Sequence, residues 1–393
     1  MMDQTQDFFH KKVKKSVALL QENISGLRQT VLQTKRFPEE VWQAMAQVGL
    51  MGCLIPKEYG GNHLGLLELA WGMENFSTCA YASPLPMLTN MAIICLVRHG
   101  SDELKKKFLP KLASGGIKSC VAATEEVSGT NMFRIETRAD KKEGRYILNG
   151  SKIYISGADI ADKMLVLVRT KTAAECQKEG LPKTFGLSVF FIDVRSSGVT
   201  LEKMPTRGEV SLQQNIIRFK DVKISEEDLI GPQDMGAMVM FDAINVERVL
   251  GTALVLGVSQ HCLDVATDYA KKRNVFGEKT IASYQAIQHP LAETKIRQEA
   301  CRLMMEKAAC FFDEAADPSQ VGFYANMAKY LGAELGLKAV DAAIETLGGK
   351  GFHENHDLIH LWEQARLFKT APVSNNMILN FIAEHTLGLP RSY

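Results

Sequence analysis

The first part of the chain carries apolar residues at helical spacing. Residues 37–40 (FPEE) predict the start of one helix, because proline suits the first turn and acidic residues suit the positive end of the helix dipole. Val41, Met45 and Val48 then recur along one helical face. The same spacing predicts further helices over residues 64–78, 86–99 and 102–113. Residues 1–118 are therefore expected to form a helical domain.

From about residue 119 the apolar positions alternate with a period of two, which is typical of strands. Residues 145–156 read as two strands around Asn149-Gly150, a pair of residues typical of a tight hairpin turn. The alternation continues in three more segments, residues 164–168, 187–194 and 215–219. We therefore expect a compact antiparallel sheet domain over residues 119–231.

Beyond Gly231-Pro232 the chain returns to helices. Residues 237–273 contain few helix breakers and are apolar on several faces, which indicates a helix buried in a bundle. Further helices are predicted over residues 283–314, 321–347 and 375–385, and Pro290 should kink the first of these or move its start. The whole pattern predicts an α+β fold in which a second helical domain, residues 232–393, follows the sheet.

Composition narrows the class of protein. Of 393 residues, 46% are hydrophobic and 23% are charged, as in an ordinary globular protein. The 46 basic and 45 acidic residues nearly balance, so neither nucleic acid nor an anionic membrane is the expected partner. No apolar run approaches the roughly 20 residues of a membrane span, and the polar N-terminus lacks the core of a signal peptide.

The eight cysteines are scattered and form no Cys-x-x-Cys pair. The spacing therefore predicts neither a metal site nor a disulfide framework, and it favours thiols in a reducing cytoplasm. We expect a cytoplasmic protein.

Four short strings stand in order along the chain: residues 49–61 (GLMGCLIPKEYGG), 149–156 (NGSKIYIS), 273–288 (RNVFGEKTIASYQAIQ) and 347–352 (LGGKGF). Each is weak alone, but in this order and at these separations they resemble the acyl-CoA dehydrogenase family over essentially the whole chain. The resemblance implies an acyl-CoA dehydrogenase-like fold with a C-terminal four-helix bundle, and FAD as the cofactor. It also implies a homotetramer or dimer, because FAD lies at a subunit interface in this family.

The family resemblance further implies desaturation of an acyl-CoA between the carbons α and β to the thioester, with an electron-transferring flavoprotein as electron acceptor. Such a reaction needs a base for the α-proton, a hydride acceptor and stabilisation of the thioester oxygen. The family base usually stands near the C-terminus, where this chain has Pro372 in the string APVS. The alternative family position, used by some branched-chain and long-chain members, is matched by Glu247.

We therefore expect Glu247 to be the catalytic base, because desolvation on an apolar helix would raise its pKa towards that of the activated acid. Its neighbour Arg248 matches a family arginine that helps to shape the CoA and base region. A second interpretation stays open for both residues, namely that they are structural partners in buried ion pairs.

Pro372 raises a further question, because proline has no N–H to donate to the thioester oxygen. In the family a backbone N–H at this position helps to hold that oxygen, and losing such a donor costs about 3–4 kcal/mol in the barrier. Three outcomes stay open: Val373 donates instead, the enzyme is slow, or the reaction differs.

Contacts with FAD are carried over from the family to the following residues: Thr124, Thr130, Tyr154, Ser156, Arg273, Phe276, Gln285, Glu345, Gly348, Gly349, Ser374 and Asn376. Arg273 is the expected diphosphate anchor, because a guanidinium binds phosphate through two parallel hydrogen bonds. Tyr154 stands where a tryptophan commonly covers the flavin. Glu345 replaces a common glutamine, and its charge would repel a diphosphate unless it is offset. Alternatives stay open for some of these residues: a turn residue at Thr130, a core side chain at Tyr154, a solvated charge at Arg273 and a helix-ending pair at Gly348 and Gly349.

The leading prediction is an FAD-dependent acyl-CoA dehydrogenase. One alternative is a family relative with other flavin chemistry, as an oxidase, monooxygenase or reductase, because a fold does not decide the reaction. The other is an inactive flavin- or CoA-binding scaffold, which Pro372 would explain. The length and branching of the acyl chain are not predicted.

Overall fold

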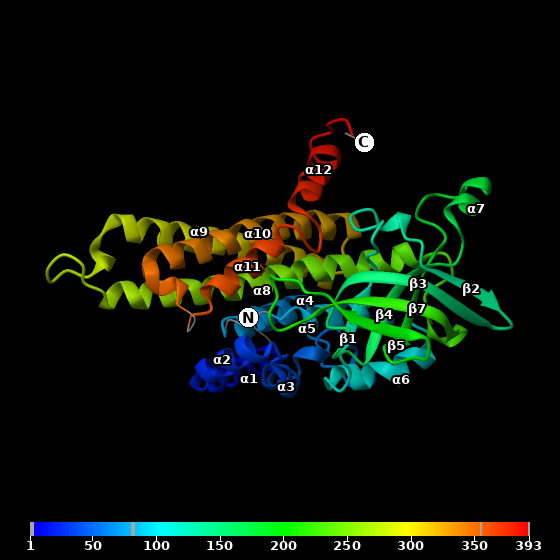
Figure 1. Ribbon diagram of the computed structural model, residues 1–393, viewed down its shortest axis with the longest axis horizontal. Coiled ribbons are helices and arrows are strands. Elements are labelled where there is room, and N and C mark those ends of the chain that lie inside the picture. Colours follow the sequence, from blue (N-terminus) through cyan, green and yellow to red (C-terminus); the bar gives the residue numbers. More distant parts are fainter. Residues whose placement is uncertain (1–3, 80–82, 354–355, 392–393) are drawn as a thin grey trace.

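The computed structural model describes residues 4–79, 83–353 and 356–391 (Figure 1). Helices come first along the chain, a sheet follows, and long helices return, which confirms the predicted α+β order. The helices before the sheet are α1 (Gln4–Glu22), α2 (Ile24–Thr34), α3 (Glu39–Gln47), α4 (Leu66–Ser77), α5 (Leu85–His99) and α6 (Asp102–Ala113).

The sheet consists of β1 (Ser119–Ala122), β2 (Arg138–Lys142), β3 (Arg145–Ser156), β4 (Lys163–Arg169), β5 (Leu187–Asp193), β6 (Val199–Lys203), β7 (Gln214–Ser225) and β8 (Leu229–Ile230), with the short helix α7 (Ala173–Lys178) between β4 and β5. The strand order is β6-β7-β3-β2-β4-β5-β8, and β1 pairs with β4. Most pairs are antiparallel, but β1 and β2 each run parallel to β4. The prediction of a wholly antiparallel sheet is therefore wrong at these two pairs.

The hairpin predicted at Asn149-Gly150 is wrong. Residues 145–156 form one continuous strand, β3, which pairs with β2 on one side and with β7 on the other. The turn lies instead at Glu143-Gly144, between β2 and β3. Both turn residues have positive φ, 48° and 73°, as a two-residue type I′ hairpin requires.

Asn149 and Gly150 mark a bulge between β3 and β7. Gly150 has φ 138°, and a Cβ there would lie 2.7 Å from the Cα of Thr137. The Asn149 side chain accepts a hydrogen bond from the Asp221 backbone N–H at 2.9 Å. The residues that resemble a turn therefore serve a close approach between neighbouring segments, which the sequence of one strand does not specify.

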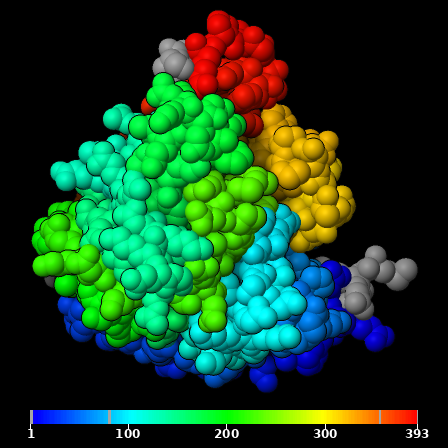
Figure 2. Space-filling model, turned by 90° about the vertical axis from the view of Figure 1, so that its right-hand side faces the viewer, coloured from blue at the N-terminus to red at the C-terminus, as the bar shows by residue number. Residues whose placement is uncertain are grey.

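The helices after the sheet are α8 (Gly236–Lys272), α9 (Gln285–Asp313), α10 (Pro318–Leu347), α11 (Leu358–Phe368) and α12 (Asn375–His385). The long helices α8, α9 and α10 lie side by side, and α11 packs against α8 and α10 (Figure 1). Pro290 does not move the start of α9, which begins five residues earlier. Figures 1 and 2 both show α12 projecting from the body of the molecule.

The helix α8 is the centre of the core. It contacts α4, α5, α9, α10 and α11, and a Cβ at Gly257 would lie 2.3 Å from the backbone oxygen of Glu74 in α4. By length and composition α8 could cross a membrane, but 83% of its most apolar window is buried inside the protein. Apolar residues on all faces are equally typical of a helix in the core of a bundle.

Candidate active site

Glu247 lies in the fourth turn of α8, where its side chain is half-buried and the neighbouring residues Val246, Val249 and Leu250 are fully buried. Its carboxyl group makes no hydrogen bond and no ion pair with any residue that the structure describes. Burial raises its pKa from 4.5 to about 7, although the nearby charges of Arg248 and Lys329 oppose the rise. A carboxylate of this pKa is suited to remove a proton near neutral pH.

Arg248 follows Glu247 on the helix, so the two side chains leave α8 in different directions. Its guanidinium donates to the side-chain oxygen of Asn245 at 3.3 Å and forms no ion pair with Glu247. The Arg248 Nε is buried and has no hydrogen-bond partner in the described parts of the chain. Burial lowers the Arg248 pKa to about 10. Buried donors are normally satisfied, so this Nε is a candidate donor to a bound ligand.

Lys329, which the sequence analysis missed, completes this cluster from α10. Its side chain is buried with 2% exposed, and its ammonium donates to the backbone oxygen of Val373 and to the Asn375 side chain at 3.0 Å. Burial first, and then Arg248, lower the Lys329 pKa to about 8. A lysine within a helical run of small buried residues, such as Ala325 and Ala328, is the signal that could have identified it.

The segment that contains Pro372 is tied to α10 from one side. The Lys329 ammonium donates a hydrogen bond to the Val373 backbone oxygen. The Asn375 amide donates to the Glu334 carboxylate at 2.9 Å. The backbone N–H groups of Val373 and Ser374 donate to no residue in the described ranges. Pro372 is exposed, so the segment presents two unused donors next to the position where the proline removes one.

Predicted FAD contacts from the β-domain lie on neighbouring segments. The Ile153 N–H donates to the Thr124 backbone oxygen at 2.9 Å, which joins β3 to the loop that also carries Thr130. Tyr154 follows at an irregularity between β3 and β7, with φ 55° and 57% of its surface exposed. The Ser156 hydroxyl accepts from the Gln214 amide at 2.8 Å.

A buried ion pair fixes the loop that carries Thr124 and Thr130. The Lys152 ammonium lies 2.8 Å from Glu125, and both side chains are buried. Glu125 also accepts from the backbone N–H of Thr137 at 3.0 Å. Removing one member of such a pair leaves an uncompensated charge, so the pair holds residues 123–137 in one conformation.

A second group of predicted FAD contacts follows the C-terminal end of α8. Arg273 is exposed and its guanidinium makes no contact with the described residues, while Phe276 is 78% exposed. Gln285 is exposed at the start of α9. An exposed guanidinium that is followed along the chain by an exposed ring and an exposed amide suits a diphosphate with an attached ring system.

The glycine turn after α10 lies at the same end of the bundle. Lys350 lies over the ring of Tyr269 in the last turn of α8, at 5.3 Å. A Cβ at Gly348 or Gly349 would meet no atom within 4 Å, so the turn faces open space. Glu345 is exposed nearby. Gly348 and Gly349 therefore leave room for a cofactor to approach the backbone of this turn from its exposed side.

The structure does not bring the two groups together. The helix α8 has 37 residues, which corresponds to a length of about 55 Å. The β-domain adjoins its first turn, and Arg273 follows its last (Figure 1). Ser374 and the exposed Asn376, which lie beside the Lys329 contacts, belong to the end that carries Glu247. One dinucleotide cannot reach both ends within one chain.

Three models of known domains cover most of the chain: acyl-CoA dehydrogenase N-terminal domain over residues 4–116, middle domain over 120–222 and C-terminal domain over 234–387. The chain belongs to the acyl-CoA dehydrogenase family. It is accordingly an oxidoreductase, an acyl-CoA dehydrogenase. The family is FAD-dependent.

Comparisons with individual proteins show how much of the sequence and the fold this chain shares with known relatives. Acyl-CoA dehydrogenase FadE12 of Mycobacterium tuberculosis is 33% identical over 356 residues, which are 90% of this chain and 89% of that protein. Glutaryl-CoA dehydrogenase in its glutaryl-CoA complex has a TM-score of 0.90 at 27% identity, over 100% of this chain and 97% of the other. PigA in complex with FAD has a TM-score of 0.87 at 26% identity, over 99% of each chain.

Burial of Glu247 predicts a pH-dependent effect on stability. Because its pKa rises from 4.5 to about 7 on folding, the folded dehydrogenase binds more protons than the unfolded chain between these values. The free energy of unfolding therefore falls as the pH rises through this window. Glu247→Gln should increase it by about 3 kcal/mol at about pH 8, and by less at about pH 5.5.

Urea unfolding with excess FAD measures the difference. Asp264→Asn, on the same helix but exposed, is the control and should show little change at either pH. A Glu247 held in a structural ion pair would give the reverse result, with the glutamine variant less stable at both pH values.

Proposed function

We propose that Glu247 removes the α-proton of an acyl-CoA thioester during α,β-desaturation. The observation that supports this most is a half-buried carboxylate with a pKa of about 7 and no hydrogen-bond or ion-pair partner in the described chain. The position near the C-terminus where the family base usually stands carries Pro372, which cannot act as a base. When bound, FAD supplies the hydride acceptor for the reaction.

The environment of Glu247 suits both the ionised carboxylate before proton transfer and the neutral acid after it. Above about pH 7 the carboxylate is ionised and, having no hydrogen bond to any residue that the structure describes, keeps its oxygen free to take a proton. The charges of Arg248 and Lys329 keep the pKa from rising further, so the ionised form stays populated at neutral pH. After the proton arrives, the neutral acid is the form that burial favours.

We further propose that the Val373 N–H replaces the donor that Pro372 cannot provide for the thioester oxygen. This N–H donates to no described residue, and Lys329 holds the oxygen of the same residue. Arg248 would contribute its buried Nε to the substrate. Donors that are fixed before the reaction stabilise developing negative charge most, because they need not reorient.

Two copies of the chain would complete each FAD site. Thr124, Thr130, Tyr154, Ser156, Ser374 and Asn376 would come from one subunit, and Arg273, Phe276, Gln285, Glu345, Gly348 and Gly349 from its partner. The length of α8, about 55 Å, supports this division. Exposed apolar side chains that a second copy could cover lie at the start of α8, on α9 and on α12: Met238, Phe241, Ile296, Leu303 and Leu379. We therefore propose a homodimer or homotetramer.

Glu247→Gln should lower turnover by about 100- to 10,000-fold while FAD is retained, because the amide cannot take the proton. The initial rate is measured over a panel of acyl-CoA thioesters, once with a dye as acceptor and once with an electron-transferring flavoprotein, our proposed natural acceptor. The rate of the unchanged enzyme should rise with pH through about 7. Asp264→Asn serves as the control, and near-normal turnover of the glutamine variant would remove Glu247 from this role.

Arg273→Ala should weaken FAD retention roughly tenfold or more, because the charge-assisted hydrogen bonds to the diphosphate are lost. The ratio of flavin to protein after gel filtration measures this effect. Lys272→Ala removes a neighbouring exposed charge and should leave the ratio as it is. An unchanged ratio in the arginine variant contradicts the anchor.

Co-expression of the Glu247→Gln and Arg273→Ala chains tests whether the site is shared between subunits. A mixed dimer would contain one site with both native residues, so activity at subsaturating FAD should exceed that of either variant alone. Light scattering establishes the number of subunits. Mixed dimers without recovered activity, or a monomeric active enzyme, would refute the division of the site.

A further inference from the structure

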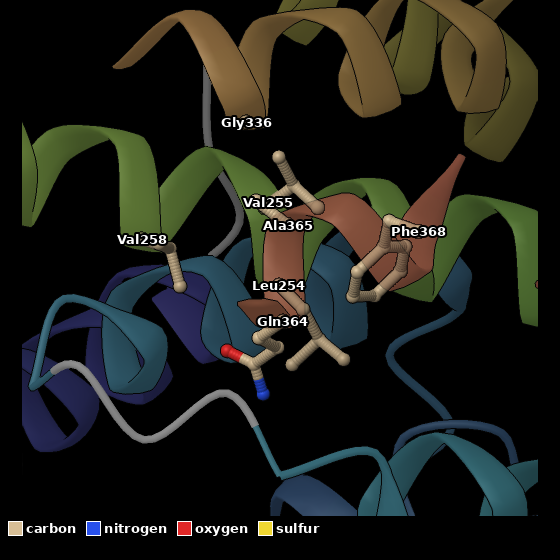
Figure 3. A pocket seen from close by; sticks show the side chains of 7 residues that line it. All are labelled: Leu254, Val255, Val258, Gly336, Gln364, Ala365 and Phe368. Atoms are coloured by element: carbon tan, nitrogen blue, oxygen red, sulfur yellow. The ribbon is translucent and has the colours of Figure 1, made fainter. Parts of the chain in front are cut away.

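One face of α8 leads from Glu247 to a small apolar cavity. Gly251 follows one helical turn after Glu247, and Leu254, Val255 and Val258 continue the same face. These last three side chains line a cavity between α8, α10 and α11 with a volume of about 10 Å³ (Figure 3). The cavity is completed by Gly336, Gln364, Ala365 and Phe368.

The polar side chain in the lining of the cavity, Gln364, is already hydrogen-bonded to a residue outside it. The Gln364 amide donates a hydrogen bond to Glu209, so the remaining lining is aliphatic and aromatic. The volume is at the lower limit for a single water molecule, which would find few polar partners there. The space therefore suits hydrocarbon better than a polar group.

The ring of Phe368 stands between Glu247 and this cavity. A Cβ at Gly251 would lie 3.2 Å from the Phe368 ring and 3.6 Å from the Met87 sulfur, so these side chains occupy the space over Gly251. Figure 3 shows Phe368 at one end of the cavity and Val258 at the other. Because Gly251 precedes Val258 on α8, Phe368 lies at the end nearer Glu247.

We infer that Phe368 limits the length of the acyl group by closing the apolar space beyond Gly251. The inference rests on the proposed function, because Glu247 must face the carbon next to the thioester for the rest of the acyl group to follow α8. Met87 is a softer wall, since an unbranched methionine adapts its shape. The aromatic ring is rigid and therefore determines where a straight chain ends.

Removing the ring should join the space over Gly251 to the cavity. In Phe368→Ala, kcat/KM for the shortest straight-chain acyl-CoA should change by less than about threefold. For chains longer than the wild-type optimum it should rise by about fourfold for each further methylene buried, until the joined space is filled. Gly251→Ala adds a methyl group against the ring and should shift the preference towards shorter chains.

Binding of straight-chain alkyl-CoA thioethers, measured by calorimetry on the FAD-loaded enzymes, provides a second measurement. These compounds lack the thioester carbonyl, so their affinity reports the acyl space independently of Glu247. Phe311→Ala is the matched control, because Phe311 is also a half-buried ring packed on the core. The control should leave the length preference unchanged.

The outcomes separate the two hypotheses. A length preference that Phe368→Ala leaves unchanged, in turnover and in thioether binding, overturns the role of Phe368. An equal shift in Phe311→Ala overturns it too, because the effect would then be general loosening of the bundle. If the Phe368→Ala variant binds longer thioethers but neither it nor the unchanged enzyme oxidises any acyl-CoA, the proposed function is contradicted. The role of Phe368 in limiting the length of the bound chain is then still supported.

Discussion

The desolvation of one carboxylate is the constraint around which the candidate active site is organised. Removing a charged group from water without a hydrogen bond costs several kcal/mol, and a protein normally avoids it. Here the core helix α8 places Glu247 in a half-buried position without a hydrogen-bond partner in the described chain, and Arg248 and Lys329 provide opposite charge without forming an ion pair with it. The carboxyl group therefore stays free for a ligand at the expense of stability, as expected of a catalytic group.

Two buried lysines fix the segments that surround this carboxylate. Lys329 binds the backbone of the segment after α11, and Lys152 binds Glu125 under the loop that carries Thr124. Burial lowers the pKa of each lysine to about 8, and each also donates to a backbone oxygen. Irregular segments without a regular ladder of hydrogen bonds are thereby held in one arrangement, which a site with fixed donors requires.

The length of α8 has a second consequence. About 39 Å of helix, 26 residues at about 1.5 Å each, separates Glu247 from the exposed Arg273, so the two regions cannot approach each other within one chain. The same face of the helix that carries Glu247 continues past Gly251 to the apolar cavity behind Phe368. The helix α8 thus sets the relative positions of the proposed base Glu247, the proposed acyl boundary at Phe368 and the proposed diphosphate anchor Arg273.

Local patterns in the sequence were sufficient for the helices and for the order of the three parts. The bounds of α6 and α12 were predicted correctly, because apolar spacing is a local signal. The structure shows that each helix also begins at a local cap, Ser101 for α6 and Ser374 for α12. Glu247 and the FAD contacts were proposed from short strings whose residues are close in the chain. By contrast, Asn149-Gly150 became a bulge instead of a turn, because the register between β3 and β7 depends on residues about 70 positions apart.

The sequence by itself determined the fold class, the family and the identity of the residues that could carry the chemistry. Only the tertiary structure decided that Glu247 has no hydrogen-bond or ion-pair partner among the described residues, that Lys329 reaches Val373, and that Phe368 covers Gly251. The physical reason is that pattern and propensity act between neighbours in the chain. Burial, unpaired donors and cavities depend on which distant helices meet, and no local pattern of residues specifies that.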